Sequence, residues 1–189
     1  MLSHRFESAL VYAAAAHAAQ RRKGTDVPYV AHLLSVCAIV LEHGGDEDQA
    51  IAALLHDAVE DQGGKPRLAD IEKRFGPRVA ALVEACTDAD VVPKPPWKER
   101  KLRYIEALEH HDPDAWLVSC ADKLHNSDTV LRDYRELGDA LWPRFKGGKE
   151  GTLWYYRRLA DEFNRLMPGP LARALDETIS ELESAVAGA

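Results

Sequence analysis

The chain has 189 residues, enough for a domain that buries about 70% of its unfolded surface in a core. Its 31 acidic and 24 basic residues give a net charge of -7, which argues against binding a nucleic-acid polymer because phosphates require an excess of cations. No apolar run approaches the roughly 18 residues of a membrane-spanning helix, and the first residues lack the apolar core of a signal peptide. We therefore expect a cytoplasmic protein without membrane or nucleic-acid partners, and a homo-oligomer stays open.

Hydrophobic residues recur every three to four positions through most of the chain, a spacing that predicts helices. No segment alternates convincingly between apolar and polar residues, so strands are not expected. Three prolines among residues 93–96 exclude a helix over 87–96, where we expect an ordered loop. The expected helices span about 3–21, 28–44, 46–63, 68–75, 77–86, 97–110, 112–137, 153–166 and 171–182.

These segments predict an all-α fold of about nine or ten helices. We expect residues 1–189 to form a single domain, with the motifs in about 1–130 and a helical extension over about 131–189. Cys37, Cys86 and Cys120 lie singly in apolar helical runs. They are expected to be small buried hydrophobes and not a disulfide or a thiolate metal site.

The segment Ala52-Ala-Leu-Leu-His-Asp-Ala-Val-Glu-Asp61 places four ionisable side chains at the end of an apolar helical run. On one continuous helix, His56/Glu60 and Asp57/Asp61 form two i,i+4 pairs on neighbouring faces. The pattern is typical of two metal ligands followed one turn later by acid/base carboxylates. The alternative is a surface helix end that carries solvated acids.

Three of the expected helices each carry a polar side chain on a face that should be internal. An imidazole and carboxylate set suits Mn²⁺, Fe²⁺ or Zn²⁺, and the absence of nearby thiolates argues against a closed structural zinc site. Such an ion lowers the pKa of a water molecule that it binds. Taken singly, His32 could be a hydrogen-bonded core histidine and Asp122 a helix anchor, so the prediction depends on their joint occurrence. The set consists of His32, His56, Asp57 and Asp122.

The order His32, then His56-Asp57, then Asp122 resembles the HD-domain phosphohydrolases, in which an H…HD…D set binds the catalytic metal. A longer series of segments is similar to the RelA/SpoT hydrolase domain over about residues 10–130, and especially to the stand-alone small alarmone hydrolases. These segments are His17-Ala-Ala-Gln-Arg-Arg-Lys23, Pro28-Tyr-Val-Ala-His32, Ala52 to Asp61, Ile71-Glu-Lys-Arg-Phe-Gly76, Thr87-Asp88 and Ala121-Asp-Lys-Leu-His-Asn126.

The resemblance implies an HD-domain helical bundle and a specific reaction. The expected activity is metal-dependent hydrolysis of the 3′-diphosphate of guanosine tetra- and pentaphosphate (ppGpp and pppGpp), with release of pyrophosphate. Mn²⁺ is the expected cofactor, with Zn²⁺ or Fe²⁺ as alternatives. The resemblance assigns Glu60 and Asp61 to activating or orienting the attacking water, and the partner is a small nucleotide substrate.

The resemblance also implies substrate contacts for Arg22, Lys23, Asn126 and Tyr155. On residue chemistry alone, the two cations could be a solvated helix end and Tyr155 could belong to the core. Two positions depart from the family pattern. Leu33 replaces a proline that usually follows the first histidine, and Asp90 lies where related hydrolases often have a lysine.

Two other functions remain open from the sequence. The first is an HD phosphatase that acts on another nucleotide, such as an adenosine alarmone, a deoxynucleotide or NADPH. The second is a non-catalytic nucleotide sensor that has kept the pocket. The presence of both Glu60 and Asp61 argues against the sensor, because a sensor needs no acid/base pair.

Overall fold

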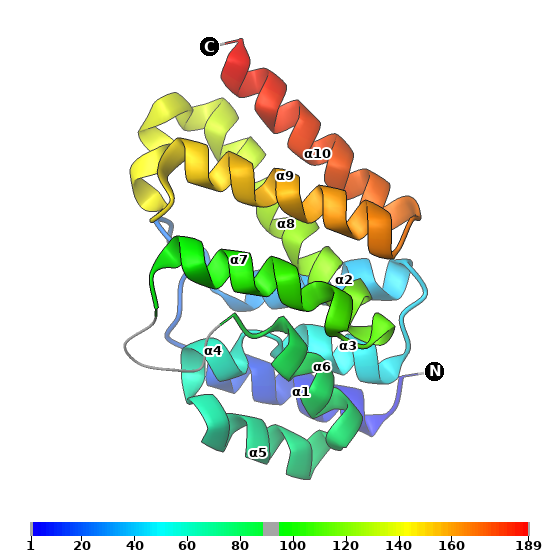
Figure 1. Ribbon diagram of the computed structural model, residues 1–189. Helices are drawn as coiled ribbons and strands as arrows, with labels where there is room; N and C mark the ends of the chain where they lie inside the picture. The colour runs from blue at the N-terminus through cyan, green and yellow to red at the C-terminus, as the bar shows by residue number, and fades with distance from the viewer. Residues whose placement is uncertain (1, 89–94, 189) are drawn as a thin grey trace. The chain divides into compact units, whose positions relative to one another are not determined.

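The computed structural model describes residues 2–88 and 95–188, and no β-strand occurs within them. Helices account for most of this part of the chain, which confirms the predicted all-α class (Figure 1). No helix in these two stretches is both long and apolar enough to cross a lipid bilayer. The helices are α1 (His4–Ala16), α2 (Val30–Glu42), α3 (Glu47–Leu55), α4 (Ala58–Gln62), α5 (Gly64–Phe75), α6 (Pro77–Cys86), α7 (Trp97–Ala107), η1 (Leu108–His110), α8 (Pro113–Leu137), η2 (Gly138–Arg144), α9 (Gly148–Leu166) and α10 (Pro170–Ala187).

The described residues form two compact units. The first contains residues 2–88 and 111–121, and therefore α1 to α6 with the beginning of α8. The second contains residues 95–110 and 122–188, and therefore α7, η1, the rest of α8, η2, α9 and α10. The predicted single domain over 1–189 stays a prediction.

Helix α3 is the centre of the first unit. Every residue from Gln49 to Leu55 is buried, and α3 packs against α1, α2 and α6. A helix that is apolar on all sides needs such surroundings, because each face must be removed from water. Packing therefore holds the C-terminal end of this helix in place, and His56 follows directly after it.

Both ends of the α2–α3 connection are capped. At the end of α2, Gly44 has φ +84°, its N–H donates to Leu41 O at 3.1 Å, and the Gly45 N–H donates to Val40 O at 2.9 Å. This is the hydrogen-bond pattern of a Schellman motif. At the start of α3 a capping box joins Asp46 to Gln49. The predicted helix end at the two glycines is confirmed, and α2 is held beside α3.

The first helix is shorter than predicted: it ends at Ala16 instead of about residue 21. The chain then turns back in a loop closed by two backbone hydrogen bonds. The Arg22 N–H donates to Val27 O at 2.8 Å, and the Tyr29 N–H donates to Gln20 O at 3.0 Å. The loop can replace a longer helix because these bonds satisfy backbone groups that the helix would otherwise have satisfied.

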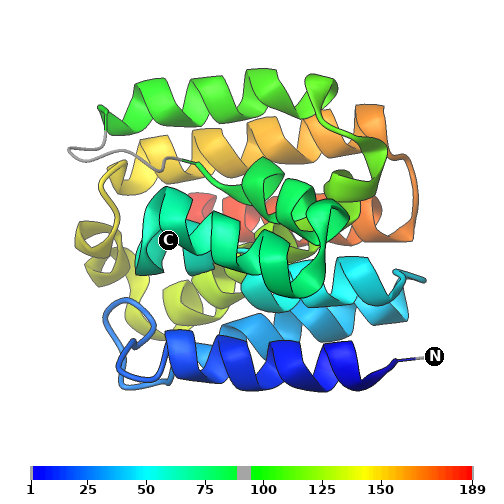
Figure 2. The same ribbon diagram turned by 90° about the horizontal axis from the view of Figure 1, so that it is seen from below.

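In the second unit, α9 packs against α7, η2 and α10. Helices α7 and α9 run alongside each other in both views (Figure 1, Figure 2). Helix α10 packs on α9, and it begins at Pro170, one residue before the expected start. The Arg157 guanidinium joins these two helices through ion pairs with Asp176 and Glu183.

Candidate metal centre

The helix that was expected over residues 46–63 is divided into two. Helix α3 ends at Leu55 and α4 begins at Ala58, with His56 as the C-cap of the first and Asp57 as the N-cap of the second. The prediction of one continuous helix was therefore wrong. On a continuous helix, adjacent side chains point in different directions, whereas the interruption lets these two converge. His56 Nε2 lies 3.1 Å from Asp57 Oδ2.

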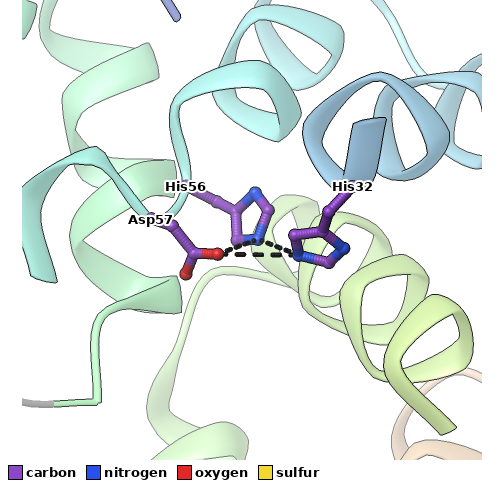
Figure 3. A group of neighbouring side chains, drawn as sticks. All are labelled: His32, His56 and Asp57. Carbon is purple, nitrogen blue, oxygen red and sulfur yellow. Dashed lines mark hydrogen bonds and ion pairs between the residues drawn. The ribbon is translucent and has the colours of Figure 1, made fainter. Parts of the chain in front are cut away.

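His32 of α2 completes a group of three potential ligands (Figure 3). Its Nε2 lies 3.2 Å from His56 Nε2 and 3.5 Å from Asp57 Oδ2. Both imidazoles are buried and the carboxylate is partly exposed. The ligand atoms of all three side chains lie within 4.8 Å of one another. The structure thus brings together three of the four predicted metal ligands, all of them in the first unit.

The donor chemistry of the group fits a divalent cation. His56 Nδ1 lies 2.7 Å from Ala53 O, and a carbonyl oxygen can only accept, so Nδ1 carries the hydrogen. The Nε2 of that tautomer has a lone pair, and this atom faces the other two side chains. Two imidazole nitrogens and one carboxylate oxygen are ligands suited to borderline divalent metals.

Tyr29 fixes the carboxylate of this group. Its hydroxyl donates to Asp57 Oδ2 at 2.5 Å, the same oxygen that lies near both histidines. Its ring is stacked on His17 at 5.1 Å, and the Arg22 guanidinium lies 5.6 Å from the ring centre. Sequence reasoning missed Tyr29, although its place three residues before His32 puts both on one helical face.

The two predicted acid/base residues lie on α4 and bind different parts of the first unit. Glu60 is half-buried, and its Oε2 accepts a hydrogen bond from the Asp88 N–H at 3.2 Å. Asp61 is exposed, and its Oδ2 accepts from Gln20 Nε2 at 2.8 Å. Each carboxylate therefore has a defined anchor, which distinguishes this helix from a surface helix carrying only solvated acids.

The fourth predicted ligand, Asp122, lies in the second unit, on α8. It is buried, with Oδ2 2.5 Å from Lys123 Nζ and Oδ1 accepting from Asn126 Nδ2 at 2.6 Å. Burial acts to lower the pKa of Lys123, but the Asp122 carboxylate opposes this and the pKa lies well above its ordinary value. The role of Asp122 as a metal ligand stays a prediction.

The remaining predicted substrate contacts lie in both units. Arg22 is half-buried beside Tyr29, and Lys23 is exposed. Tyr155 of the second unit is buried, with its ring 6.1 Å from that of Trp97 and 4.7 Å from Lys101 Nζ. Asn126 binds Asp122, as described above.

The two departures from the family pattern have different outcomes. Leu33 is fully buried in α2, where it packs in the core immediately after His32. Asp90 lies outside the described residues. The three cysteines are buried, as predicted, and burial raises the pKa of the Cys37 thiol to about 11.

Residues 9–152 match the family model of the HD domain, and the chain belongs to this family. MESH1 of Homo sapiens, a guanosine-3′,5′-bis(diphosphate) 3′-pyrophosphohydrolase, is 40% identical over 134 residues, which cover 69% of this chain and 70% of MESH1. The rsh GTP pyrophosphokinase of Brucella ovis is 37% identical over 134 residues, 68% of this chain but only 18% of that protein. A solved metazoan SpoT ortholog that hydrolyses ppGpp is 33% identical, with a TM-score of 0.78 and coverage of 95% of this chain and 96% of its own.

Membership of the HD-domain family implies a divalent metal, and the group of His32, His56 and Asp57 suits one. The predicted resemblance to HD-domain hydrolases of the RelA/SpoT type is confirmed.

Replacing Tyr29 with phenylalanine should weaken metal binding. The ring and its stacking remain, but Asp57 loses the hydroxyl that orients it, and loss of such an outer partner commonly lowers metal affinity roughly 10-fold or more. Titration of chelator-treated protein with a divalent metal measures the change. Tyr12→Phe is the matched control, because that hydroxyl binds Asp70 instead. An unchanged affinity in Tyr29→Phe would contradict the role assigned to the hydroxyl.

Proposed function

We propose that this protein is a metal-dependent hydrolase that removes the 3′-diphosphate of guanosine tetra- and pentaphosphate. The convergence of His32, His56 and Asp57 carries the proposal, because it occurs in a chain 40% identical to a 3′-pyrophosphohydrolase. Hydrolysis adds water across the bond between the ribose 3′ oxygen and the adjacent phosphorus. The products are pyrophosphate and the nucleoside 5′-diphosphate or 5′-triphosphate with a restored 3′ hydroxyl.

Mn²⁺ is the proposed cofactor, with Zn²⁺ or Fe²⁺ as alternatives. The nitrogen and oxygen donors suit all three ions, and no thiolate belongs to the group. When bound, such an ion stabilises negative charge on phosphoryl oxygens and lowers the pKa of water. Asp122 is proposed as the fourth ligand on the basis of the family resemblance.

Glu60 and Asp61 are the proposed acid/base residues. They follow Asp57 by three and four residues, about one helical turn, and this spacing supports the proposal. A carboxylate at this position can accept the proton that the attacking water loses as its oxygen bonds to phosphorus. The anchors of the two residues on Asp88 and Gln20 restrict their motion, which such proton transfer requires.

The proposed substrate contacts are Arg22, Lys23, Asn126 and Tyr155. Arg22 has the strongest support, because it lies over Tyr29 and Tyr29 binds Asp57. A guanidinium beside Tyr29 can stack on a purine or form a bidentate pair with phosphate. For the other three residues the support is the family resemblance.

Incubation of metal-loaded protein with a nucleotide panel tests the function. We expect intact pyrophosphate from the guanosine tetraphosphate, identified by mass. Asp61→Asn and Glu60→Gln should keep the metal and lower kcat roughly 100-fold, the usual scale for a positioned acid/base group. Glu84→Gln, an exposed change on α6, is the control. Release of monophosphate alone would contradict the proposed reaction. Unaltered kcat in both variants would contradict the acid/base role of Glu60 and Asp61.

Neutralising Asp122 together with its partner tests the fourth ligand. Asp122→Asn alone leaves the Lys123 ammonium buried without its carboxylate, which endangers folding, so both charges are removed in Asp122→Asn/Lys123→Met. If Asp122 binds the metal, the double variant should lose more than about 10-fold in affinity, since even outer partners contribute that much. Lys123→Met alone should keep the metal. Full metal occupancy by elemental analysis of the double variant would leave Asp122 as a helix anchor.

Arg22→Ala should raise KM for the guanosine tetraphosphate by roughly 10-fold, the scale of one charge-assisted hydrogen bond. Its kcat should change little if the guanidinium binds ground and transition states alike. The neighbouring Arg21→Ala removes an exposed side chain and serves as the control for net charge. Equal KM values for the two variants would show that the effect of Arg22 is only electrostatic and long-range.

A further inference from the structure

The side-chain amide of Gln20 lies at the centre of a hydrogen-bond network that includes Asp61. Its Nε2 donates to Asp61 Oδ2 at 2.8 Å. Its Oε1 lies 2.7 Å from His17 Nδ1 and accepts from Gln62 Nε2 at 2.6 Å. One amide therefore joins the segment after α1 to both Asp61 and Gln62 of α4.

The chemistry of the partners fixes the direction of each bond. A carboxylate only accepts, so the amide nitrogen of Gln20 must face Asp61 and the amide oxygen must face His17. His17 Nδ1 then carries the hydrogen. The other ring nitrogen, Nε2, is buried with no hydrogen-bond partner in the described part of the chain, where a hydrogen would be costly. The carboxylate, the amide and the imidazole thus have one consistent arrangement.

The backbone of this segment is also restrained. The Gln20 N–H donates to His17 O at 3.0 Å, and Gln20 O accepts from the Tyr29 N–H at 3.0 Å. The His17 ring is buried and stacked on Tyr29, with the planes 16° apart. Gln20 is consequently held from both its backbone and its side chain, so its amide presents Nε2 in one direction.

The same support reaches the metal group. Tyr29 stacks on His17 and donates its hydroxyl to Asp57, while Gln20, bound to His17, donates to Asp61. A metal ligand and a proposed catalytic carboxylate are thus oriented by adjacent members of one network. Both carboxylates are therefore held by side chains from outside α4.

We infer that Gln20 is a positioning residue for the hydrolysis, and that it acts by holding the Asp61 carboxylate in the orientation that receives the proton of the attacking water. This inference rests on the proposed function of Asp61. The amide fixes Oδ2 and thereby the plane of the carboxylate, so Oδ1 is presented in a defined direction. His17 and Gln62 act one step further away, by keeping the amide oxygen of Gln20 turned from Asp61.

Gln20→Leu removes the amide while keeping the approximate volume of the side chain. We expect kcat to fall roughly 10-fold, the scale of a hydrogen bond to a charged group, with KM and metal content unchanged. Gln20→Glu should lower kcat further, because it places a second carboxylate against Asp61. Thermal unfolding of each variant separates a loss of fold from a loss of positioning.

Variants of His17 provide a rescue experiment. If His17 only filled space in the core, restoring an N–H donor at this position would not restore kcat. His17→Phe keeps a ring against Tyr29 but removes the Nδ1 hydrogen, so kcat should fall with little change in metal content. His17→Asn has an amide N–H that can replace this donor, and it should recover part of the lost kcat. If Gln20→Leu does not fold, Gln62→Leu removes a single hydrogen bond to the same amide oxygen and takes its place.

A double-mutant cycle decides whether Gln20 acts through Asp61. Gln20→Leu should cost no further activity in the Asp61→Asn background, because the group that it positions is already impaired. An equal loss in both backgrounds, or an unchanged kcat for Gln20→Leu beside an impaired Asp61→Asn, would overturn the positioning role alone. A wild-type protein that releases no pyrophosphate would overturn the proposed function and, with it, this inference.

Discussion

The interruption between α3 and α4 is the constraint on which the candidate site depends. Adjacent residues of a regular helix point about 100° apart, so the His56 and Asp57 side chains would not face each other on such a helix. α3 ends at Leu55 and α4 begins at Ala58, and at this junction His56 Nε2 lies 3.1 Å from Asp57 Oδ2. The interruption needs rigid surroundings, because two short helices have little stability of their own. The burial of residues 49–55 of α3 against α1, α2 and α6 supplies them.

The loop between α1 and α2 supplies the second set of restraints. It contains no predicted metal ligand or acid/base residue, yet its side chains hold one of each: Tyr29 binds Asp57 and Gln20 binds Asp61. The stacking of His17 on Tyr29 joins these two supports in a single network. A ligand oriented by an outer partner loses less conformational entropy when the metal binds. The loop therefore contributes preorganisation, and its own cation Arg22 is held by a backbone hydrogen bond to Val27 O.

The sequence predicted features that arise from local chemistry. The all-α class, the end of α2 before Gly44, the start of α6 at Pro77 and the chain break that precedes α10 follow from periodicity, glycine and proline. The break at His56 could not be predicted in this way, because residues 52–61 contain no glycine or proline that would indicate it. The roles of Tyr29 and Gln20 were missed for a similar reason. Neither is a typical metal ligand, and their partners lie 28 and 41 residues away in the chain.

The charge of the site differs from the charge of the chain. The chain as a whole has a net charge of -7, which repels a polyanionic nucleotide at long range. The group of two neutral imidazoles and one carboxylate is different, because a bound divalent ion leaves it with a net positive charge. With Arg22 beside Tyr29, attraction for phosphate is concentrated at short range, where charges in a partly buried site are least screened. The use of imidazole in place of further carboxylates thus lets an acidic protein present a cationic site to a highly charged substrate.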